Sequence, residues 1–266
     1  RIQFGDRSYL DKVSITTAEF FEELATNPAA PTTSQPSPGD FRRQYQYLAT
    51  HFPDVISINL TGAVSGTLQA AESAASRTNA PGRIHVVDSR NASLGPGQLA
   101  VFAAECAAAG LDIEATLDAL HQMVNVTTSF ALVRDLSYAV RGGRVPASRK
   151  LVADWLGLTP VLQTRTDGSV ASGGLLPGRR NLLPKFARFI ARRCNPDADL
   201  HLAFGHALCE DDARSLDAML RDIMPNVKKS SLTGLGSALG VHGGPGSLVV
   251  GVQEFRAPAA FAGKLS

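Results

Sequence analysis

The sequence predicts an α/β protein with two domains. In the first half of the chain, apolar runs rich in β-branched residues alternate with helical segments, and this order is typical of a parallel sheet covered by helices. After residue 127 the order changes to short strands, a hairpin and further helices, which indicates a mixed sheet. The length of 266 residues suits two domains. We therefore expect a parallel-sheet α/β/α domain over residues 1–126 and a mixed-sheet α/β domain over residues 127–266.

The expected helices of the first half begin at recognisable caps. Residues 16–19 and 37–40 both read as capping boxes, and Asp112 caps a later helix. Because ligands bind beyond the carboxyl ends of parallel strands, we expect Ser65 and Ser89, which each follow a strand, to lie at one edge of the sheet. The expected helices cover residues 16–24, 37–50, 66–77, 97–109 and 112–124, and the expected strands cover residues 55–60 and 83–88.

The second half is expected to fold around a hairpin that turns at Asp167 and Gly168. A glycine-rich turn is expected over residues 141–144 and another over residues 240–246. The expected strands cover residues 129–133, 159–164, 169–175, 200–206 and 247–252, and the expected helices cover residues 147–155, 182–193 and 211–223.

Charge is distributed unevenly between the two halves. Residues 1–126 hold 8 Lys and Arg against 13 Asp and Glu, a net charge of −5, and residues 127–266 hold 18 against 11, a net charge of +7. The basic half suits an acidic partner, a phosphate or an anionic surface, although a mixed solvated surface would give the same count. The cluster at Arg141, Arg144, Arg149 and Lys150 lacks the interleaved aromatic residues of a nucleic-acid site, so we expect no nucleic-acid partner.

The composition indicates a cytoplasmic protein. Its three cysteines show neither paired spacing nor a metal-binding pattern, which favours a reducing compartment and no metal. The longest apolar candidate, residues 99–111, is interrupted by Glu105 and is too short to span a membrane. We find no signal peptide, P-loop or dinucleotide fingerprint, and we expect no cofactor.

The most informative segment joins the strand at residues 55–60 to the following helix. Ser65 is expected at the helix N-cap, Gly66 allows close approach to the backbone, and Thr67 adds a second hydroxyl. Such a helix end binds a carboxylate or a phosphate. Ser65 could equally be a cap without a ligand. It does not fit the G-x-S-x-G pattern of an esterase nucleophile, because Gly62 lies one residue too early.

Five short motifs together resemble the DegV family of bacterial fatty-acid-binding proteins. They are TSQPS at residues 33–37, SGT at 65–67, VVDSR and SLGPG within 86–97, RGGRV at 141–145 and HGGPG at 242–246. The resemblance implies the two-domain DegV fold, with the ligand between the domains. Members of the family usually begin with a further strand and an Asp-Ser turn, so the resemblance also implies that N-terminal residues are missing here.

The family resemblance assigns roles to particular residues. Ser65 would hold a fatty-acid carboxylate with the help of Thr33, and the neighbouring Ser34, Gly66 and Thr67 would complete the site. Arg179 or Arg180 would face the head group, and His242 would be a polar neighbour of the carboxylate or of the phosphate that replaces it.

The same resemblance implies a binding protein and not an enzyme. A separate ATP-dependent kinase would convert the bound long-chain fatty acid to an acyl-phosphate, and the acyl chain would lie in an apolar tunnel. The basic half would receive the kinase and could contact a membrane surface transiently. Two alternatives remain: a serine esterase that uses Ser65 and His242, and a phosphosugar-binding regulator that uses the same helix end.

Overall fold

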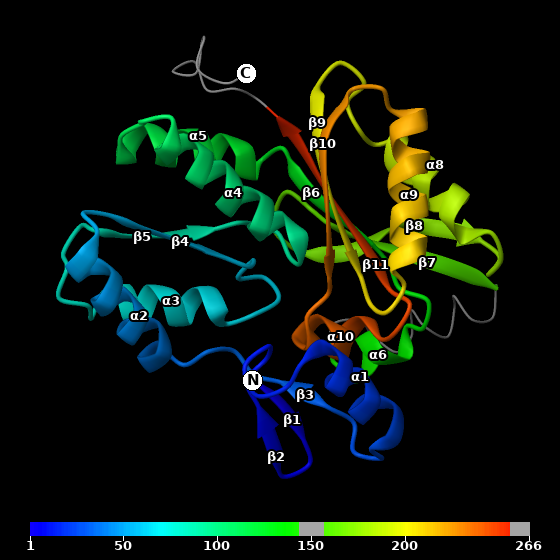
Figure 1. Cartoon of the computed structure of the whole chain (residues 1–266), viewed down its shortest axis with the longest axis horizontal. Helices are drawn as coiled ribbons and strands as arrows, with labels where there is room; N and C mark the ends of the chain where they lie inside the picture. Colours follow the sequence, from blue (N-terminus) through cyan, green and yellow to red (C-terminus); the bar gives the residue numbers. More distant parts are fainter. Residues whose placement is uncertain (144–156, 256–266) are drawn as a thin grey trace.

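The computed structural model describes residues 1–143 and 157–255 and has the expected α/β architecture (Figure 1). The described residues form a small antiparallel sheet, a two-stranded parallel sheet and a six-stranded mixed sheet. The helix expected over residues 147–155 lies outside the described residues, as do Arg144, Arg149 and Lys150.

The N-terminal segment forms the small sheet, which the sequence did not predict. Strands β1 (Ile2–Phe4), β2 (Arg7–Tyr9) and β3 (Thr32–Thr33) pair in the order β2-β1-β3, and α1 (Thr17–Thr26) lies between β2 and β3 in the chain. Strands of two or three residues are too short to show an alternating pattern. The capping box predicted for α1 is confirmed: Thr16 Oγ1 accepts a hydrogen bond from Glu19 N, and Glu19 Oε2 accepts from Thr16 N.

The parallel sheet has helices on both faces. Strands β4 (Val55–Asn59) and β5 (Ile84–Asp88) pair in parallel. One face contacts α2 (Pro38–His51) and α3 (Thr67–Ala75), and the other contacts α4 (Leu94–Ala108), which packs in turn against α5 (Ile113–Val124) (Figure 1). This is the predicted α/β/α arrangement.

The mixed sheet has the strand order β10-β9-β11-β6-β7-β8, in which only the β9–β10 pair is parallel. The predicted hairpin at residues 167–168 is confirmed between β7 and β8. Helix α6 follows β6, and α10 precedes β11. The bounds of these elements are β6 (Thr127–Leu132), α6 (Ser137–Arg141), β7 (Leu158–Thr164), β8 (Val170–Pro177), α8 (Leu182–Ala191), β9 (Asp199–His206), α9 (Glu210–Ile223), β10 (Val227–Gly234), α10 (Ser237–Gly243) and β11 (Leu248–Phe255).

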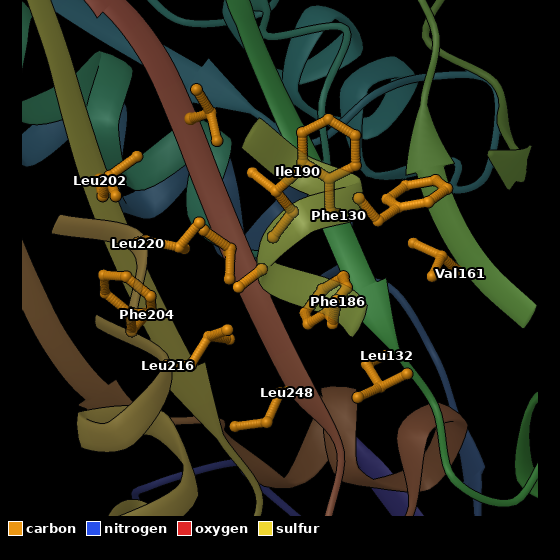
Figure 2. Packing of buried hydrophobic residues seen from close by; sticks show 14 of the residues in the cluster. Phe130, Leu132, Val161, Phe186, Ile190, Leu202, Phe204, Leu216, Leu220 and Leu248 are labelled. Carbon is orange, nitrogen blue, oxygen red and sulfur yellow. The ribbon is translucent and has the colours of Figure 1, made fainter. Parts of the chain in front are cut away.

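The largest group of buried side chains lies between the mixed sheet and helices α8 and α9 (Figure 2). Phe186 and Ile190 of α8 and Leu216 of α9 are fully buried against Phe130 and Phe204 of the sheet. Helix α4 packs on the opposite face of the same sheet, against β11, β6 and β9. Helix α4 therefore connects the parallel sheet to the mixed sheet.

A second cluster joins the two ends of the chain. Ile2, Phe4, Phe20 and Phe21 pack with residues of the C-terminal half, of which Val241 lies on α10. The buried side chains of the small N-terminal sheet therefore belong to the same cluster as residues of the C-terminal half. The domain boundary predicted between residues 126 and 127 stays a prediction.

The starts of two predicted helices and one predicted turn differ from the structure in ways that bear on the site. Helix α4 begins at Leu94 and not at residue 97, and α3 begins at Thr67 with Gly66 at its N-cap, so Ser65 lies one residue before the predicted position. Residues 240–243 of the expected glycine-rich turn belong instead to α10, which begins at Ser237, and β10 was not predicted.

Candidate functional site

The N-terminal end of α3 carries two hydroxyl groups in contact. Ser65 Oγ accepts a hydrogen bond from Thr67 N at 3.2 Å and lies 2.8 Å from Thr67 Oγ1. The Ser65 hydroxyl thus bonds a backbone N–H of the first turn, as a capping hydroxyl does, although the N-cap residue is Gly66. The partial positive charge of a helix start and these hydroxyls suit an oxyanion.

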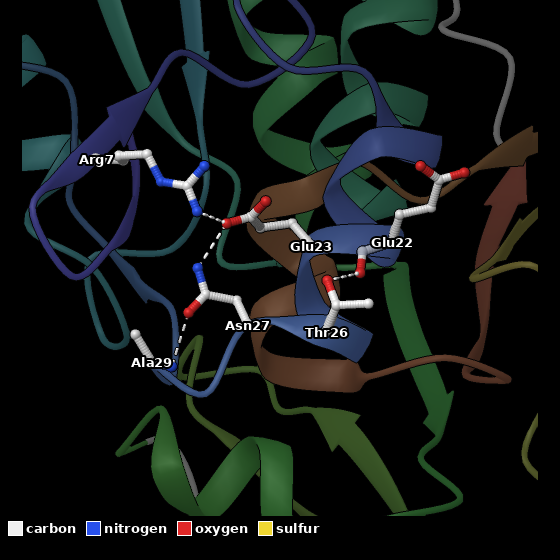
Figure 3. A network of polar contacts seen from close by, with 6 residues as sticks. All are labelled: Arg7, Glu22, Glu23, Thr26, Asn27 and Ala29. Carbon is white, nitrogen blue, oxygen red and sulfur yellow. Dashed lines mark hydrogen bonds and ion pairs between the residues drawn. The ribbon is translucent and has the colours of Figure 1, made fainter.

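Thr33 is held in place by the small sheet. It pairs with Ile2 across β1 and β3, and the next residue, Ser34, donates its backbone N–H to Arg1 O at 3.1 Å. Polar contacts at the end of α1 fix the turn that leads into β3. Arg7 pairs with Glu23, whose Oε1 also accepts from Asn27 Nδ2, and Asn27 Oδ1 accepts from Ala29 N at 2.8 Å (Figure 3). The strand that carries Thr33 is therefore well anchored.

His242 lies in the last turn of α10, which corrects the prediction of a glycine-rich turn. Helix α10 is capped from a distance, because Asp11 Oδ1 and Oδ2 accept hydrogen bonds from Ser237 N and Ala238 N, both at 3.1 Å. His242 Nε2 lies 3.0 Å from Thr33 Oγ1, a hydrogen bond between two residues that the resemblance assigned to one site.

The glycine motif at residues 141–143 supports the His242 ring. The ring lies directly on Gly142 at the end of α6, where a methyl group on Gly142 would come within 2.7 Å of His242 Cε1. A side chain at residue 142 would therefore displace the imidazole. Gly244 has the same relation to the ring of Tyr138 and has a positive φ of 70°. Gly142 is thus required by its close packing against His242, and Gly244 by its positive φ and its close packing against Tyr138.

Gln35 contacts the N-terminal end of α3. Its side-chain amide lies on Gly66 with the oxygen nearest, so that a methyl group there would clash with Gln35 Oε1. The TSQPS and SGT motifs therefore meet in the structure, while Thr33 of the first motif bonds His242 of the HGGPG motif. Four of the five motifs are thus connected by direct contacts, since Gly142 of the RGGRV motif lies against His242.

A buried polar group that the sequence did not predict lies at the carboxyl edge of the parallel sheet. Asn91 is fully buried, its Nδ2 donates to Thr127 O at 2.8 Å, and its Oδ1 accepts from Thr164 Oγ1 at 3.3 Å. Thr61, also buried, lies so close to the hairpin turn that a side chain at Gly168 would clash with it. These contacts join the parallel sheet to β6 and β7. Their sequence signal, a polar run directly after each strand, does not identify the partner strands.

The two arginines expected near the head group follow β8. Because Pro177 pairs with Leu158, this end of β8 lies at the end of the sheet from which α6 and α10 extend. Both arginines are exposed, and Arg180 O accepts a hydrogen bond from Lys185 Nζ at 2.9 Å. Among the described residues, no hydrogen bond or ion pair joins Arg180 to Ser65 or Thr33, and the choice between Arg179 and Arg180 stays open.

An open pocket of about 440 Å³ lies at the other end of the mixed sheet, near the carboxyl ends of α8 and α9. It is lined by Arg188, Arg192 and Cys194, among others, and burial raises the pKa of the Cys194 thiol to about 11. The distance along β9 separates this pocket from His242, so it is not the expected acyl tunnel. The tunnel stays a prediction.

The described residues contain no group of three or more His, Cys, Asp or Glu side chains arranged for a metal ion. Among these residues there is also no helix with the length and hydropathy needed to cross a bilayer.

The hydrogen bonds at the site do not form a nucleophile–base pair. Ser65 Oγ is bonded to Thr67, whereas His242 Nε2 is bonded to Thr33. Activation of a serine nucleophile requires a hydrogen bond to its base. The observed arrangement is suited to holding an anion.

Comparison with known proteins agrees with this description. A curated relative from Deinococcus radiodurans, a DegV domain-containing protein, is 28% identical over 257 residues, which are 96% of this chain and 90% of the relative. The solved structure described as "Fatty Acid Binding of a DegV family Protein from Thermus thermophilus" is 31% identical with a TM-score of 0.84, covering 96% of this chain and 90% of that one.

A more distant structure shares the fold. The Streptococcus pneumoniae Fatty Acid Kinase (Fak) B3 protein loaded with linoleic acid is 18% identical with a TM-score of 0.84, and the match covers 96% of this chain and 89% of that chain. The family model described as "Uncharacterised protein, DegV family" matches residues 1–254. The chain therefore belongs to the DegV family.

Proposed function

We propose that this protein binds one long-chain fatty acid and presents it to a separate ATP-dependent kinase, which forms the acyl-phosphate. The observation that supports the proposal best is the meeting of three motifs at one place. Gln35 lies on Gly66 at the start of α3, and Thr33 bonds His242. The described binding of fatty acids by the Thermus thermophilus relative, at 31% identity, adds support.

The carboxylate would bind at the N-terminal end of α3. Ser65 and Thr33 would donate hydroxyl hydrogen bonds, with Ser34, Gly66 and Thr67 around them. His242 would donate from its ring once Thr33 turns its own hydroxyl to the ligand, and Arg179 or Arg180 would add positive charge. Hydrogen bonds to a charged group contribute about 1.5–3 kcal/mol each.

The acyl chain would supply most of the affinity. Burial of about a dozen methylenes contributes roughly 0.8 kcal/mol each, several times the contribution of one head-group hydrogen bond. The polar residues would therefore determine orientation and the preference for a free acid, while the chain determines affinity.

Native mass spectrometry of the purified protein is the first test. We expect a co-purified mass equal to one fatty acid, which is lost on extraction with organic solvent and restored by added oleic acid. Calorimetry should then give one site per chain. Failure to take up any long-chain acid would refute the proposal, and turnover of a p-nitrophenyl ester that depends on Ser65 would favour the esterase alternative.

The kinase would dock on the basic half, at the end of the mixed sheet that carries Arg179 and Arg180. Replacing both with Glu should slow association with the kinase and reduce its dependence on salt, because charges at the rim of an interface act mainly on the association rate. Arg42 and Arg77, which are exposed on α2 and just after α3 in the acidic half, provide the matched control pair. Equal rates and equal salt dependence for both pairs would refute this docking site.

We place this function in the cytoplasm. All three cysteines are free thiols, and burial raises the pKa values of Cys106 and Cys194 to about 11, which keeps both thiols protonated and unreactive at neutral pH. Thiol counting on protein released from cells under non-reducing conditions should give three reduced cysteines, and a disulfide would argue against this compartment.

A further inference from the structure

Helix α8 and the turn after it carry positive charge that the fold leaves unpaired. Residues 182–196 hold one lysine, three arginines and no acidic residue. Lys185 and Arg193 donate hydrogen bonds to backbone carbonyl oxygens. The guanidinium groups of Arg188 and Arg192 are exposed and make no ion pair and no hydrogen bond within the described part of the chain. These two cations are therefore available to a partner.

The arginines of the neighbouring helix α9 are paired. Arg214 and Arg221 each form an ion pair with an acidic residue four positions earlier. Arg188 and Arg192 are also four residues apart, and Arg192 still has a helical backbone, so two like charges are adjacent on one face of α8. Such a pair repels. The repulsion is relieved when acidic groups bind beside the two charges.

Both unpaired arginines line the open pocket of about 440 Å³ at the carboxyl ends of α8 and α9. The lining also includes Ile223 and Met224, and Ile223 is 42% exposed. Asn226 fixes the shape of the pocket, because its Nδ2 donates to Asn195 O at 3.2 Å and to Ala198 O at 2.6 Å and so connects the turns before β9 and β10. The pocket thus combines an exposed apolar surface with two unpaired cations.

We propose that this pocket is a docking site for an acidic segment of a partner protein. One large apolar side chain of the segment contacts Ile223 and Met224, and carboxylates on either side of it pair with Arg188 and Arg192. Arginine binds a carboxylate through two parallel hydrogen bonds. An apolar side chain that fills a pocket beside arginine is typical of the centre of an interface. A concave surface suits such a protruding side chain better than it suits a flat membrane.

The docking site is remote from the candidate head-group site. The turns before β9 and β10 line the pocket, whereas α10, which carries His242, follows the other end of β10. The eight residues of β9 extend about 23 Å at about 3.3 Å per residue. The inference is therefore independent of the proposed function, and a partner bound here leaves the Arg179 and Arg180 end of the sheet free.

A fluorescein-labelled peptide with one phenylalanine flanked on each side by two glutamates is the probe. In fluorescence anisotropy we expect saturable binding to the wild-type protein with a Kd below about 1 mM. Replacing both Arg188 and Arg192 with Gln should weaken binding about tenfold, the effect of two exposed ion pairs. Replacing Arg134 and Arg214 with Gln removes the same charge near the start of α9, and this control should bind as the wild type does.

The apolar part of the contact has its own test. Ile223→Ser should weaken binding severalfold, and so should a peptide that has glycine in place of its phenylalanine. Added salt should weaken the binding of the original peptide to the wild type, because the ion pairs are exposed.

Three results would overturn the inference. The first is the absence of saturable binding by the wild type, or equal binding by the Arg188 and Arg192 double variant and its control. The second is capture of the wild type, but not of this double variant, by phosphatidylglycerol vesicles without any peptide binding, which would identify a membrane surface. The third is a melting temperature several degrees lower with unchanged peptide binding, since cations at the end of a helix also stabilise the helix itself.

Discussion

Replacing His242 with alanine should lower the stability of the ligand-free protein, because this ring connects β3, α6 and α10. The substitution removes the 3.0 Å hydrogen bond to Thr33, which contributes about 0.5–1.5 kcal/mol. It also removes the contact of the ring with Gly142. At roughly 25 cal/mol per Å² of buried apolar surface, a half-buried ring adds about 1 kcal/mol. The expected total is about 2 kcal/mol.

A loss of this size is measurable by calorimetry or circular dichroism. For a chain of this length, about 1 kcal/mol corresponds to a change of 2–4 °C in the melting temperature, so His242→Ala should melt about 4–8 °C lower. Thr33→Val removes the hydrogen bond and preserves the shape, and it should account for about 1 kcal/mol of the loss.

A double-mutant cycle between His242 and Thr33 tests whether their hydrogen bond stabilises the fold. If the hydrogen bond is as described, the double variant should lose about 1 kcal/mol less than the sum of the single losses. A melting temperature for His242→Ala within a degree of the wild type would show that the ring supports nothing in the fold. Strict additivity would show that the Thr33–His242 contact carries no stability.

Three further perturbations have defined outcomes. Ser65→Ala should weaken oleic acid binding by about tenfold to a hundredfold in calorimetry, the effect of one hydrogen bond to a charged group. It should also lower the melting temperature slightly, because Thr67 N loses its partner. Unchanged values in both would remove Ser65 from the site. Phe186→Ala, at a fully buried position, should cost about 3–5 kcal/mol in urea unfolding, and a loss below about 1 kcal/mol would contradict the described core. Burial lowers the pKa of His201, so the folded state binds fewer protons than the unfolded state, and the free energy of unfolding should fall as the pH drops below about 6.5. His201→Phe preserves the stacking on Phe255 and should lose this pH dependence. An unchanged pH profile would contradict the assignment to His201.

Helices that carry their own start signals could be predicted from the sequence. The caps at Thr16, Ser37 and Asp112 bond to residues three positions later, so the information is local. The strands β4 and β5 were predicted because their apolar runs are bounded by polar turns. The same local reasoning placed the start of α3 within one residue.

Elements that depend on distant partners could not be predicted. Helix α10 contains glycines that argue against a helix, and its cap is Asp11, 226 residues earlier than Ser237. Strand β10 lies at the edge of the sheet and has a single buried residue, Val227, so its sequence lacks the apolar pattern of a strand. Lysines are common in such edge strands. In each case the stabilising contact lies outside the window that a sequence pattern covers.

The candidate site likewise has a local part, which the sequence predicted, and a part that depends on residues far apart in the chain. The hydroxyl-rich helix end at Ser65 is a local feature and was predicted from its residues. The Thr33–His242 hydrogen bond spans 209 residues and was expected only through the family resemblance. The contact of Gln35 with Gly66 was not predicted, although Gly66 had been singled out as a place of close approach.

The cluster that joins Phe4, Phe20 and Phe21 to Val241 has a consequence for synthesis on the ribosome. Val241 follows Phe20 by 221 residues, and at translation rates of about 5–20 residues per second the N-terminal aromatic side chains emerge roughly 10–45 s before their partners. During that interval the three phenylalanines of the nascent chain have only one another and N-terminal neighbours such as Ile2 to pack against. Such a segment is a natural target for a ribosome-associated chaperone, and a truncated translation product that stops before residue 235 should be cleared by proteases far faster than the complete chain.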